Sequence, residues 1–310
     1  MARTDLKILA MIIFITVFNS LIIAQTPNEY SRQNAFVSYF SGLGNDVYQD
    51  GLNSFRDIPG SFKNMFTIPF QDGNRTTTKI GIGIVGVSFF ADKEMDNFLR
   101  TQWEPYCDKY IPETEFPLPF FRFGFEKVNF HYDFVFLTFA EYGYIVGLLT
   151  RYERFRTLCF NLLQATAYSF IFAQPVKALT GRARPWRRHN NFYKHGPWEW
   201  GHSNIHFHSG GEYNSFPSFH AIFYYSYWTI LMDFVGLRKA GPLAASLFYF
   251  QDPHHWHWAS DMIAGGILGY WLASGILENS KNRKLNVNQN LSVSVIPLKG
   301  GLGVYVSKEF

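Results

Sequence analysis

The chain has 310 residues, which is enough for one large domain or two small ones. Its formal net charge of +4 gives no reason to expect a polyanionic partner, so the composition does not favour a nucleic-acid-binding protein. Aromatic residues make up 19% of the chain, a fraction that suits either a helical core or a surface in contact with a membrane.

The N-terminal segment 1–24 has the pattern of an export signal. Arg3 and Lys7 precede an apolar run, and Ala24 offers a small residue before a cleavage point. Ile22 stands where a small residue is preferred, so a retained N-terminal anchor is the alternative. The pattern predicts an exported protein that is periplasmic or associated with the cell envelope, and membrane-bound in the alternative.

The chain contains two cysteines, Cys107 and Cys159. Export favours a compartment that permits disulfides, but two cysteines define no disulfide framework. We therefore expect two unpaired thiols, with a disulfide between them as the alternative.

The segment 25–79 is polar and rich in turn-forming residues, and we expect one amphipathic helix in it near residues 47–55. Residues 101–130 show no clear periodicity, which indicates a loop region. Five later segments are long or apolar enough to be core helices, namely 134–150, 157–176, 221–237, 243–250 and 262–277. Together they predict an all-α fold in the form of a helical bundle.

Two of these segments raise the question of a membrane. The segment 157–176 carries no charge and is long enough to span a bilayer, but it contains Asn161, Gln164 and other polar residues. The segment 134–150 carries Glu141, which is costly in lipid. The mean hydropathy of −0.09 is low for a protein with several spans. We predict a mainly extramembrane bundle, with a membrane-embedded bundle as the alternative.

The C-terminal tail differs from the rest of the chain. Residues 291–295 alternate between apolar and polar types, and a pair of glycines separates them from a second apolar stretch at 302–306. This pattern predicts a small β-hairpin, which we expect to pack on the helices because two strands cannot close a barrel. The expected domains are a signal peptide or anchor (1–24), an extension (25–79), a helical domain (80–280) and the hairpin tail (281–310).

The first chemically informative segment contains Lys177 and Arg184. They are seven residues apart, so two helical turns would bring them to one face, and Pro185 is expected to end that helix. Two cations at the end of a buried helix can hold phosphate oxygens. A solvated basic turn is the alternative, because further arginines such as Arg182 lie nearby.

The second segment is Pro217-Ser218-Phe219-His220. Proline suits the first turn of a helix, and the free N–H groups of a helix N-terminus attract anions. Ser218 can add a hydroxyl, and His220 would lie in the first turn. An ordinary helix start with an incidental histidine is the alternative.

The third segment contains His257 and Asp261, which are four residues apart and would share one face of a helix. A carboxylate bonded to one ring nitrogen fixes the tautomer of a histidine and leaves the other nitrogen to attack. An N-cap or a surface pair is the alternative.

The order and spacing of the three segments resemble a known superfamily. Lys-x6-Arg-Pro, then Pro-Ser-x-His, then His-x3-Asp is similar to the motif set of type 2 phosphatidic acid phosphatases, bacterial class A acid phosphatases and vanadium haloperoxidases. The flanking residues 181–185, 215–218 and 257–265 also look like this superfamily, and the resemblance covers roughly residues 80–278. It implies a helical bundle of that kind.

The resemblance also implies a role for each site residue. His257 would attack phosphorus to form a phosphohistidine, Asp261 would orient His257, and His220 would act as the general acid. The phosphoryl oxygens would be held by Lys177, Arg184, Ser218 and the backbone N–H of Phe219. No metal or other cofactor is implied, because side chains supply the cations.

Two positions depart from the superfamily pattern. Phe219 stands where the superfamily has glycine, and it can supply the same backbone N–H if its φ is negative. Gln251 stands where the superfamily has an arginine that holds phosphate. Losing such a donor typically costs about 10²–10³ in rate, unless Arg182, Arg187 or Arg188 replaces it in space.

The stretch between the first two segments is rich in histidine, tryptophan and glycine, with histidines at His202, His206 and His208. We interpret it as a loop that forms a rim or lid over the site. No tight ligand spacing appears in it, so we predict no metal site.

The sequence thus predicts a phosphoric monoester hydrolase that acts on a phosphomonoester or pyrophosphate. The substrate would be a phosphorylated small molecule or lipid, with the lipid favoured by the aromatic and apolar composition. Because of Gln251, one alternative is a catalytically impaired protein of the same fold that binds a phosphorylated ligand. A vanadate-dependent haloperoxidase and a structural envelope protein are further alternatives.

Overall fold

The computed structural model describes residues 29–106, 133–185, 195–201, 212–250, 257–289, 291–298 and 301–308. The chain divides into two compact units, one of Met1–Phe55 with Thr114–Thr157 and one of Arg56–Glu113 with Leu158–Phe310. The predicted export signal and Cys107 lie outside the described residues. The domain boundaries predicted from the sequence stay predictions.

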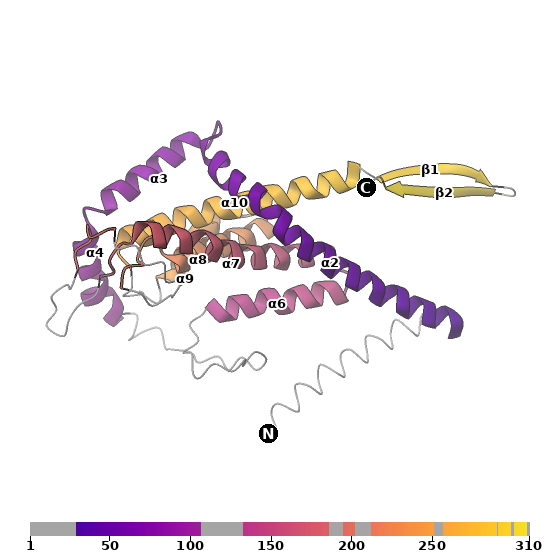
Figure 1. The fold of residues 1–310 in the computed structure, drawn as a ribbon, viewed down its shortest axis with the longest axis horizontal. Coiled ribbons are helices and arrows are strands. Elements are labelled where there is room, and N and C mark those ends of the chain that lie inside the picture. Colours follow the sequence, from indigo (N-terminus) through magenta and orange to yellow (C-terminus); the bar gives the residue numbers. More distant parts are fainter. Residues whose placement is uncertain are drawn as a thin grey trace, which may run out of the picture. The chain divides into compact units, whose positions relative to one another are not determined.

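The described part of the chain is predominantly helical, which confirms the predicted helical bundle (Figure 1). Its elements are α2 (Glu29–Thr67), η1 (Ile68–Phe70), α3 (Arg75–Ser88), α4 (Asp92–Phe98), the π-helical turn η2 (Leu99–Trp103), α6 (Asp133–Leu149), α7 (Glu153–Thr180), α8 (Phe219–Phe234), η3 (Arg238–Ala240), α9 (Gly241–Tyr249) and α10 (Ala259–Gln289). Two strands, β1 (Leu291–Leu298) and β2 (Gly301–Lys308), pair antiparallel. The packing of this tail on the helices stays a prediction.

All five predicted core helices are present, as α6 to α10. Two of them are longer than predicted. Their ends carry charged residues, so the apolar run from which each helix was predicted stops before the helix does. α7 begins at Glu153, and α10 continues through Lys281 and Arg283. The predicted loop at 101–130 is wrong over residues 101–106, which are helical, and its remainder lies outside the described residues.

The prediction that residues 25–79 are turn-rich is wrong over α2, which is a single helix of 39 residues that includes the predicted amphipathic helix. Pro59 resembles a turn signal, yet the helix continues through it. Contacts from other helices of the second unit stabilise α2 here, since Asp57 pairs with Arg283 and accepts a 3.1 Å hydrogen bond from Gln164 Nε2. Local turn propensity is overridden by these tertiary contacts.

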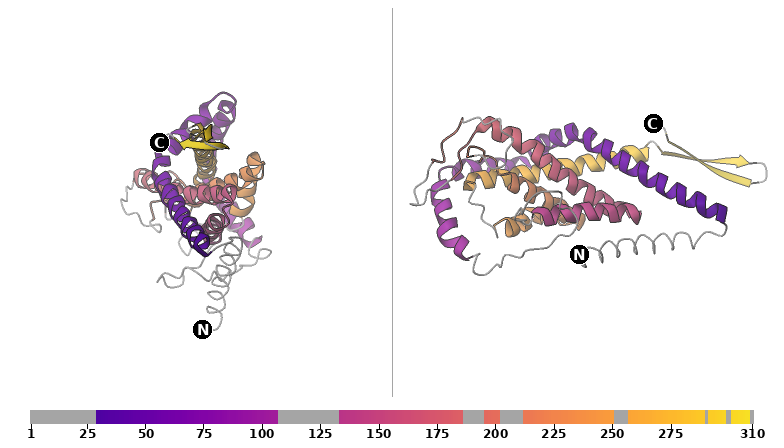
Figure 2. Two further views of the ribbon diagram at one scale, coloured as in Figure 1. Left: turned by 90° about the vertical axis from the view of Figure 1, so that its right-hand side faces the viewer. Right: turned by 60° about the horizontal axis from the view of Figure 1, so that its bottom comes forward.

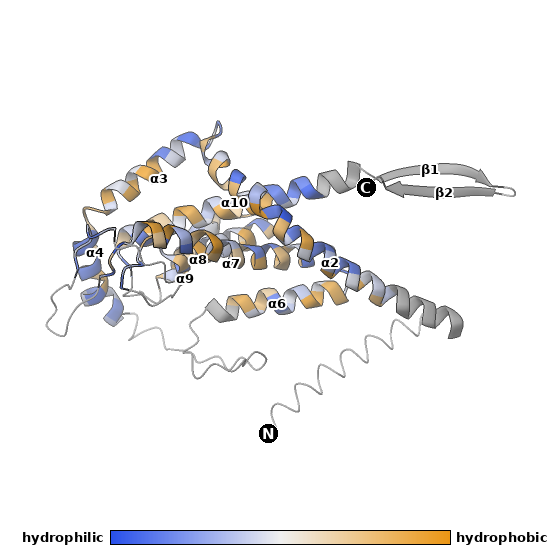
Figure 3. Cartoon of the chain, in the orientation of Figure 1, coloured by the Kyte–Doolittle hydropathy of each residue, from blue (hydrophilic) through white to orange (hydrophobic). Residues whose placement is uncertain are grey.

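In the first unit, polar contacts join the N-terminal part of α2 to α6 and to the start of α7. Tyr144 Oη donates to Asp50 Oδ2 at 2.8 Å. Asp46 accepts from Arg151 at 2.5 Å and from Arg156 at 2.9 Å. Opposite charges at the polar helix surfaces therefore hold this unit together alongside the hydrophobic residues of α6 (Figure 3).

In the second unit, α8 and α10 lie side by side (Figures 1 and 2). Glycines of α10 permit the close approach: a Cβ on Gly265 would lie 2.7 Å from Ser218 O, and one on Gly269 would collide with Ile222 O. The start of α8 is tied to the start of α10 by Ser218 N, which donates to Asp261 O at 3.1 Å. The packing of these two helices thus brings the second and third motif segments together.

The hydropathy of the helices varies along the chain. Among the described helices, none is both long enough and apolar enough to cross a bilayer. The polar side chains of α7 at Asn161, Gln164 and Gln174 are buried. In α3 a hydrophilic start gives way to hydrophobic residues (Figure 3), of which Ile82 and Ile84 are exposed.

Candidate active site

The first motif segment begins in the last turn of α7, which carries Lys177. The helix ends at Thr180 because Gly181 adopts a φ of 51°, in the left-handed region that favours glycine. The prediction that one helix carries both Lys177 and Arg184, with Pro185 as its end, is therefore wrong.

The residues after Gly181 form an extended segment that is held by backbone hydrogen bonds. Ala183 N donates to Glu199 O and Arg184 N donates to Glu212 O, each at 2.9 Å. The segment is buried, and Arg182 and Arg184 with it. The alternative of a solvated basic turn is thus wrong for these residues.

Lys177 and Arg184 are two buried cations that lie close enough to influence each other. Lys177 is 5% exposed and Arg184 is 4% exposed. Burial, reinforced by the charge of Arg184, lowers the pKa of Lys177 to about 7, and Asp261 opposes the shift. Burial also lowers the pKa of Arg184 to about 10. Within the described residues, Lys177 Nζ has no hydrogen-bond or ion-pair partner. A buried lysine in this position is suited to an anionic ligand.

The second motif segment begins α8. Ser218 is the N-cap residue, and its hydroxyl accepts from Ala221 N at 3.3 Å and lies 3.0 Å from Tyr249 Oη. Phe219 is the first helical residue, and its φ is negative, since Arg151 is the only non-glycine residue with a positive φ among those described. Phe219 therefore meets the backbone condition under which it can replace glycine. Its ring packs edge-on against Phe170, with the centroids 6.2 Å apart.

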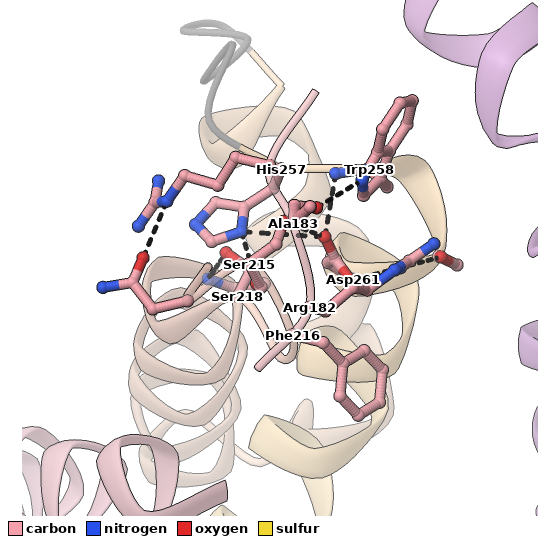
Figure 4. A network of polar contacts seen from close by, with 12 residues as sticks. Arg182, Ala183, Ser215, Phe216, Ser218, His257, Trp258 and Asp261 are labelled. Atoms are coloured by element: carbon pink, nitrogen blue, oxygen red, sulfur yellow. Dashed lines mark hydrogen bonds and ion pairs between the residues drawn. The ribbon is translucent and has the colours of Figure 1, made fainter. Parts of the chain in front are cut away.

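The third motif segment precedes and begins α10. His257 lies before the helix, which starts at Ala259, so the prediction that His257 and Asp261 share one helix face is wrong. His257 Nδ1 lies 2.7 Å from Ser215 O and 3.9 Å from the nearer Asp261 oxygen (Figure 4). The ring's hydrogen bond is therefore made to a backbone carbonyl and not to the carboxylate.

This contact determines the tautomer of His257. A carbonyl oxygen can only accept, so Nδ1 must carry the proton that it donates to Ser215 O. In the neutral ring the lone pair then lies on Nε2. His257 is 3% exposed, so the ring is held within the core of the second unit.

The Asp261 carboxylate is occupied by other donors. It accepts from Ser215 Oγ at 2.5 Å, from Trp258 N at 2.9 Å and from the Arg182 guanidinium (Figure 4). It thereby fixes the segment before α8 to the start of α10.

Arg182 occupies the centre of a buried ionic network. Its guanidinium donates to Asp261, to Asp92 Oδ2 at 2.5 Å and to Ser260 Oγ at 2.7 Å, and it stacks on the ring of Trp200 at 4.7 Å. Burial raises the pKa of Asp92, although Ser260 and Arg182 both act in the opposite direction. The Arg182 guanidinium is therefore held by two carboxylates, Asp92 and Asp261, and not available to replace the arginine that the sequence resemblance leads us to expect at position 251.

Of the remaining predicted site residues, the structure describes only His220. His220 lies in the first turn of α8, partly exposed, with its ring centroid 5.4 Å from that of Phe219. Gln251 lies outside the described residues, two positions after Tyr249, whose hydroxyl contacts Ser218. Arg187, Arg188 and the histidine-rich loop, including His202, His206 and His208, also lie outside them.

Sequence reasoning missed three residues that build this site, Ser215, Asn214 and Asp92, and it gave Arg182 a different role. Ser215 supplies the acceptor for His257, Asn214 Oδ1 accepts from Arg184 Nε at 2.7 Å, and Asp92 with Arg182 completes the ionic network. Ser215 and Arg182 lie inside the stretches that flank the motifs, which is a signal that could have identified them. Asp92 lies 90 residues from Arg182, and nothing in the sequence links the two.

Comparison with known proteins adds no identification. No protein-family model matches the chain, and neither a curated protein nor a solved structure matches it.

Proposed function

We propose that the chain is a phosphatase of the superfamily of type 2 phosphatidic acid phosphatases and class A acid phosphatases. The observation that carries this proposal is the buried Lys177, without a partner among the described residues, beside the buried Arg184. Their two positive charges suit the oxygens of a phosphoryl group. The Asp261 carboxylate acts to raise the pKa of both side chains, which opposes the lowering by burial and favours their charged forms.

The reaction would proceed in two steps. Nε2 of His257 attacks phosphorus and forms an N–P bond while the bond to the leaving oxygen breaks, and His220 donates a proton to that oxygen. Water then cleaves the phosphohistidine, with His220 taking a proton from the water. Lys177, Arg184, Ser218 and the N–H of Phe219 would stabilise the charge on the phosphoryl oxygens.

The proposed substrate is a phosphomonoester or pyrophosphate of a small molecule or lipid, met outside the cytoplasm by an exported protein. A lipid is favoured by the aromatic content of the chain and by exposed apolar side chains of the second unit, such as Ile82 and Ile84. Because side chains supply the cations, we expect phosphate release to continue in the presence of a metal chelator.

The test is phosphate release by the purified full-length protein from long-chain lipid phosphates in mixed micelles and from short soluble phosphates. His257→Gln should lower the rate at least about 10³-fold, because it removes the nucleophile. Ser226→Ala is the matched control, since it removes a buried hydroxyl that bonds only locally to Phe223 O at 2.9 Å. Activity that survives in His257→Gln would contradict the mechanism.

A second candidate function is binding of a phosphorylated ligand without turnover. It is favoured by the arginine-to-glutamine departure at position 251, together with the commitment of Arg182 to Asp92 and Asp261. An inactive wild-type protein that gains activity on Gln251→Arg would support this alternative over the phosphatase.

A further inference from the structure

Ser215 is fully buried and bonds to three parts of the site (Figure 4). Its N–H donates to Arg182 O at 3.0 Å, and its hydroxyl donates to Asp261 Oδ2 at 2.5 Å. Its carbonyl accepts from His257 Nδ1 at 2.7 Å. Because the N–H and the hydroxyl are both held, the direction of the carbonyl between them is held as well.

The Asp261 carboxylate does not hold the His257 ring directly. The 3.9 Å between Asp261 Oδ2 and His257 Nδ1 is longer than a hydrogen bond. Its short contacts go to Ser215, Trp258 and Arg182. Asp261 is therefore linked to the His257 ring through hydrogen bonds to Ser215, and not by a hydrogen bond of its own.

The same segment also contacts one member of the cation pair, Arg184. Asn214, the residue before Ser215, accepts from Arg184 Nε at 2.7 Å, and Ser218, three residues after Ser215, is the N-cap residue of α8. Loss of the Ser215 hydroxyl should therefore affect the contact with the His257 ring first. That contact is made by the backbone carbonyl of Ser215, and the hydroxyl of Ser215 helps to fix the direction of this carbonyl.

We propose that Ser215 is a positioning residue for His257. Its carbonyl fixes the tautomer with the proton on Nδ1, and Asp261 acts on the ring through the Ser215 hydroxyl. This proposal rests on the proposed function only in taking His257 as the nucleophile. It differs from the role that the sequence resemblance implies, in which Asp261 itself orients His257.

The first test reads the tautomer and needs no activity. In the full-length protein labelled with ¹⁵N-histidine, the signals of His257 are assigned by their loss in His257→Gln. The neutral ring of the wild type should carry its proton on Nδ1. In Ser215→Ala the hydroxyl no longer fixes the direction of the Ser215 carbonyl. The tautomer of His257 protonated on Nε2 should then reach a population comparable with that of the tautomer protonated on Nδ1. Ser226→Ala, the matched loss of a buried hydroxyl, should keep the wild-type tautomer.

The second test is kinetic. Ser215→Ala should lower kcat about 10–100-fold, as expected when a reacting group is misplaced, while KM changes less than about threefold. KM is spared because Lys177 and Arg184 are unchanged. Ser215→Thr keeps the hydroxyl and should retain kcat within about threefold of the wild type.

Each outcome decides the proposal. If Ser215→Ala keeps the Nδ1 proton, the proposal is overturned, whether kcat falls or not. If Ser215→Thr does not fold, the tautomer of Ser215→Ala decides alone. If the wild type hydrolyses no phosphate ester, the proposed function fails, while the tautomer experiment still tests the role of Ser215.

Discussion

At the scale of single residues, burial decides the charge state of Lys177. Burial lowers its pKa to about 7, so the side chain is charged below that pH and increasingly neutral above it. A bound anion stabilises the charged form. Binding above about pH 7 therefore requires uptake of a proton, and the affinity for an anion must fall as the pH rises.

Titration calorimetry with sulfate, which keeps its charge over this range, measures this effect. We expect a constant affinity below about pH 6 and a fall approaching tenfold per pH unit well above 7. Lys177→Arg should retain binding at pH 9, since arginine stays charged. Lys177→Met should bind weakly at every pH, whereas Lys79→Met, at an exposed lysine, should behave as the wild type. An affinity that does not change with pH in the wild type would contradict the assignment.

At the scale of elements, the contact between α8 and α10 assembles the site. The glycines of α10 let the two backbones approach, and this approach sets Ser218 beside Asp261. A backbone atom cannot move aside as a flexible side chain can, so the space at these glycines is fixed.

Gly269→Ala should destabilise the protein by about 1–3 kcal/mol, because the new methyl group meets the carbonyl of Ile222. Gly86→Ala is the control: its Cβ would have no heavy atom within 4 Å, and the loss of glycine in a helix should stabilise by about 0.5–1 kcal/mol. Chemical denaturation measures both. Equal effects of the two substitutions would show that helix propensity, and not close approach, governs Gly269.

At the scale of the whole molecule, the Arg182 network joins distant parts of the second unit. Arg182 follows α7, Asp92 lies in α4 and Asp261 lies in α10, and all three side chains are fully buried. Burying a guanidinium is tolerated here because two carboxylates, a hydroxyl and the carbonyl of Pro197 accept hydrogen bonds from it.

Arg182→Gln should cost about 3–5 kcal/mol, since it leaves Asp92 and Asp261 buried without their cation. The same substitution at Arg75, whose side chain is 59% exposed in its pair with Asp72, should change stability by less than about 1 kcal/mol. The free energy of unfolding in denaturant checks both values. A loss at Arg182 as small as that at Arg75 would contradict the assignment of Arg182 as the cation that the two buried carboxylates require.

The bundle was predictable because the apolar side chains that a core helix buries lie close together in the sequence. Each segment from α6 to α10 contains an apolar run that marks a core helix. Beyond the short helix predicted near residues 47–55, α2 escaped prediction because its polar face and Pro59 resemble a turn region, and its stability comes from partners such as Arg283. Long-range partners of this kind leave no periodic signal.

The sequence by itself determined the chemistry that the chain carries: the cations Lys177 and Arg184, the histidines His220 and His257, and the helices that bear or flank them. Only the tertiary structure decided that the cations are buried and that Arg182 is already occupied by carboxylates. It also decided that the acceptor for His257 is the carbonyl of Ser215, 42 residues away. Every residue has a carbonyl, so sequence cannot distinguish the one that a fold will aim at a histidine.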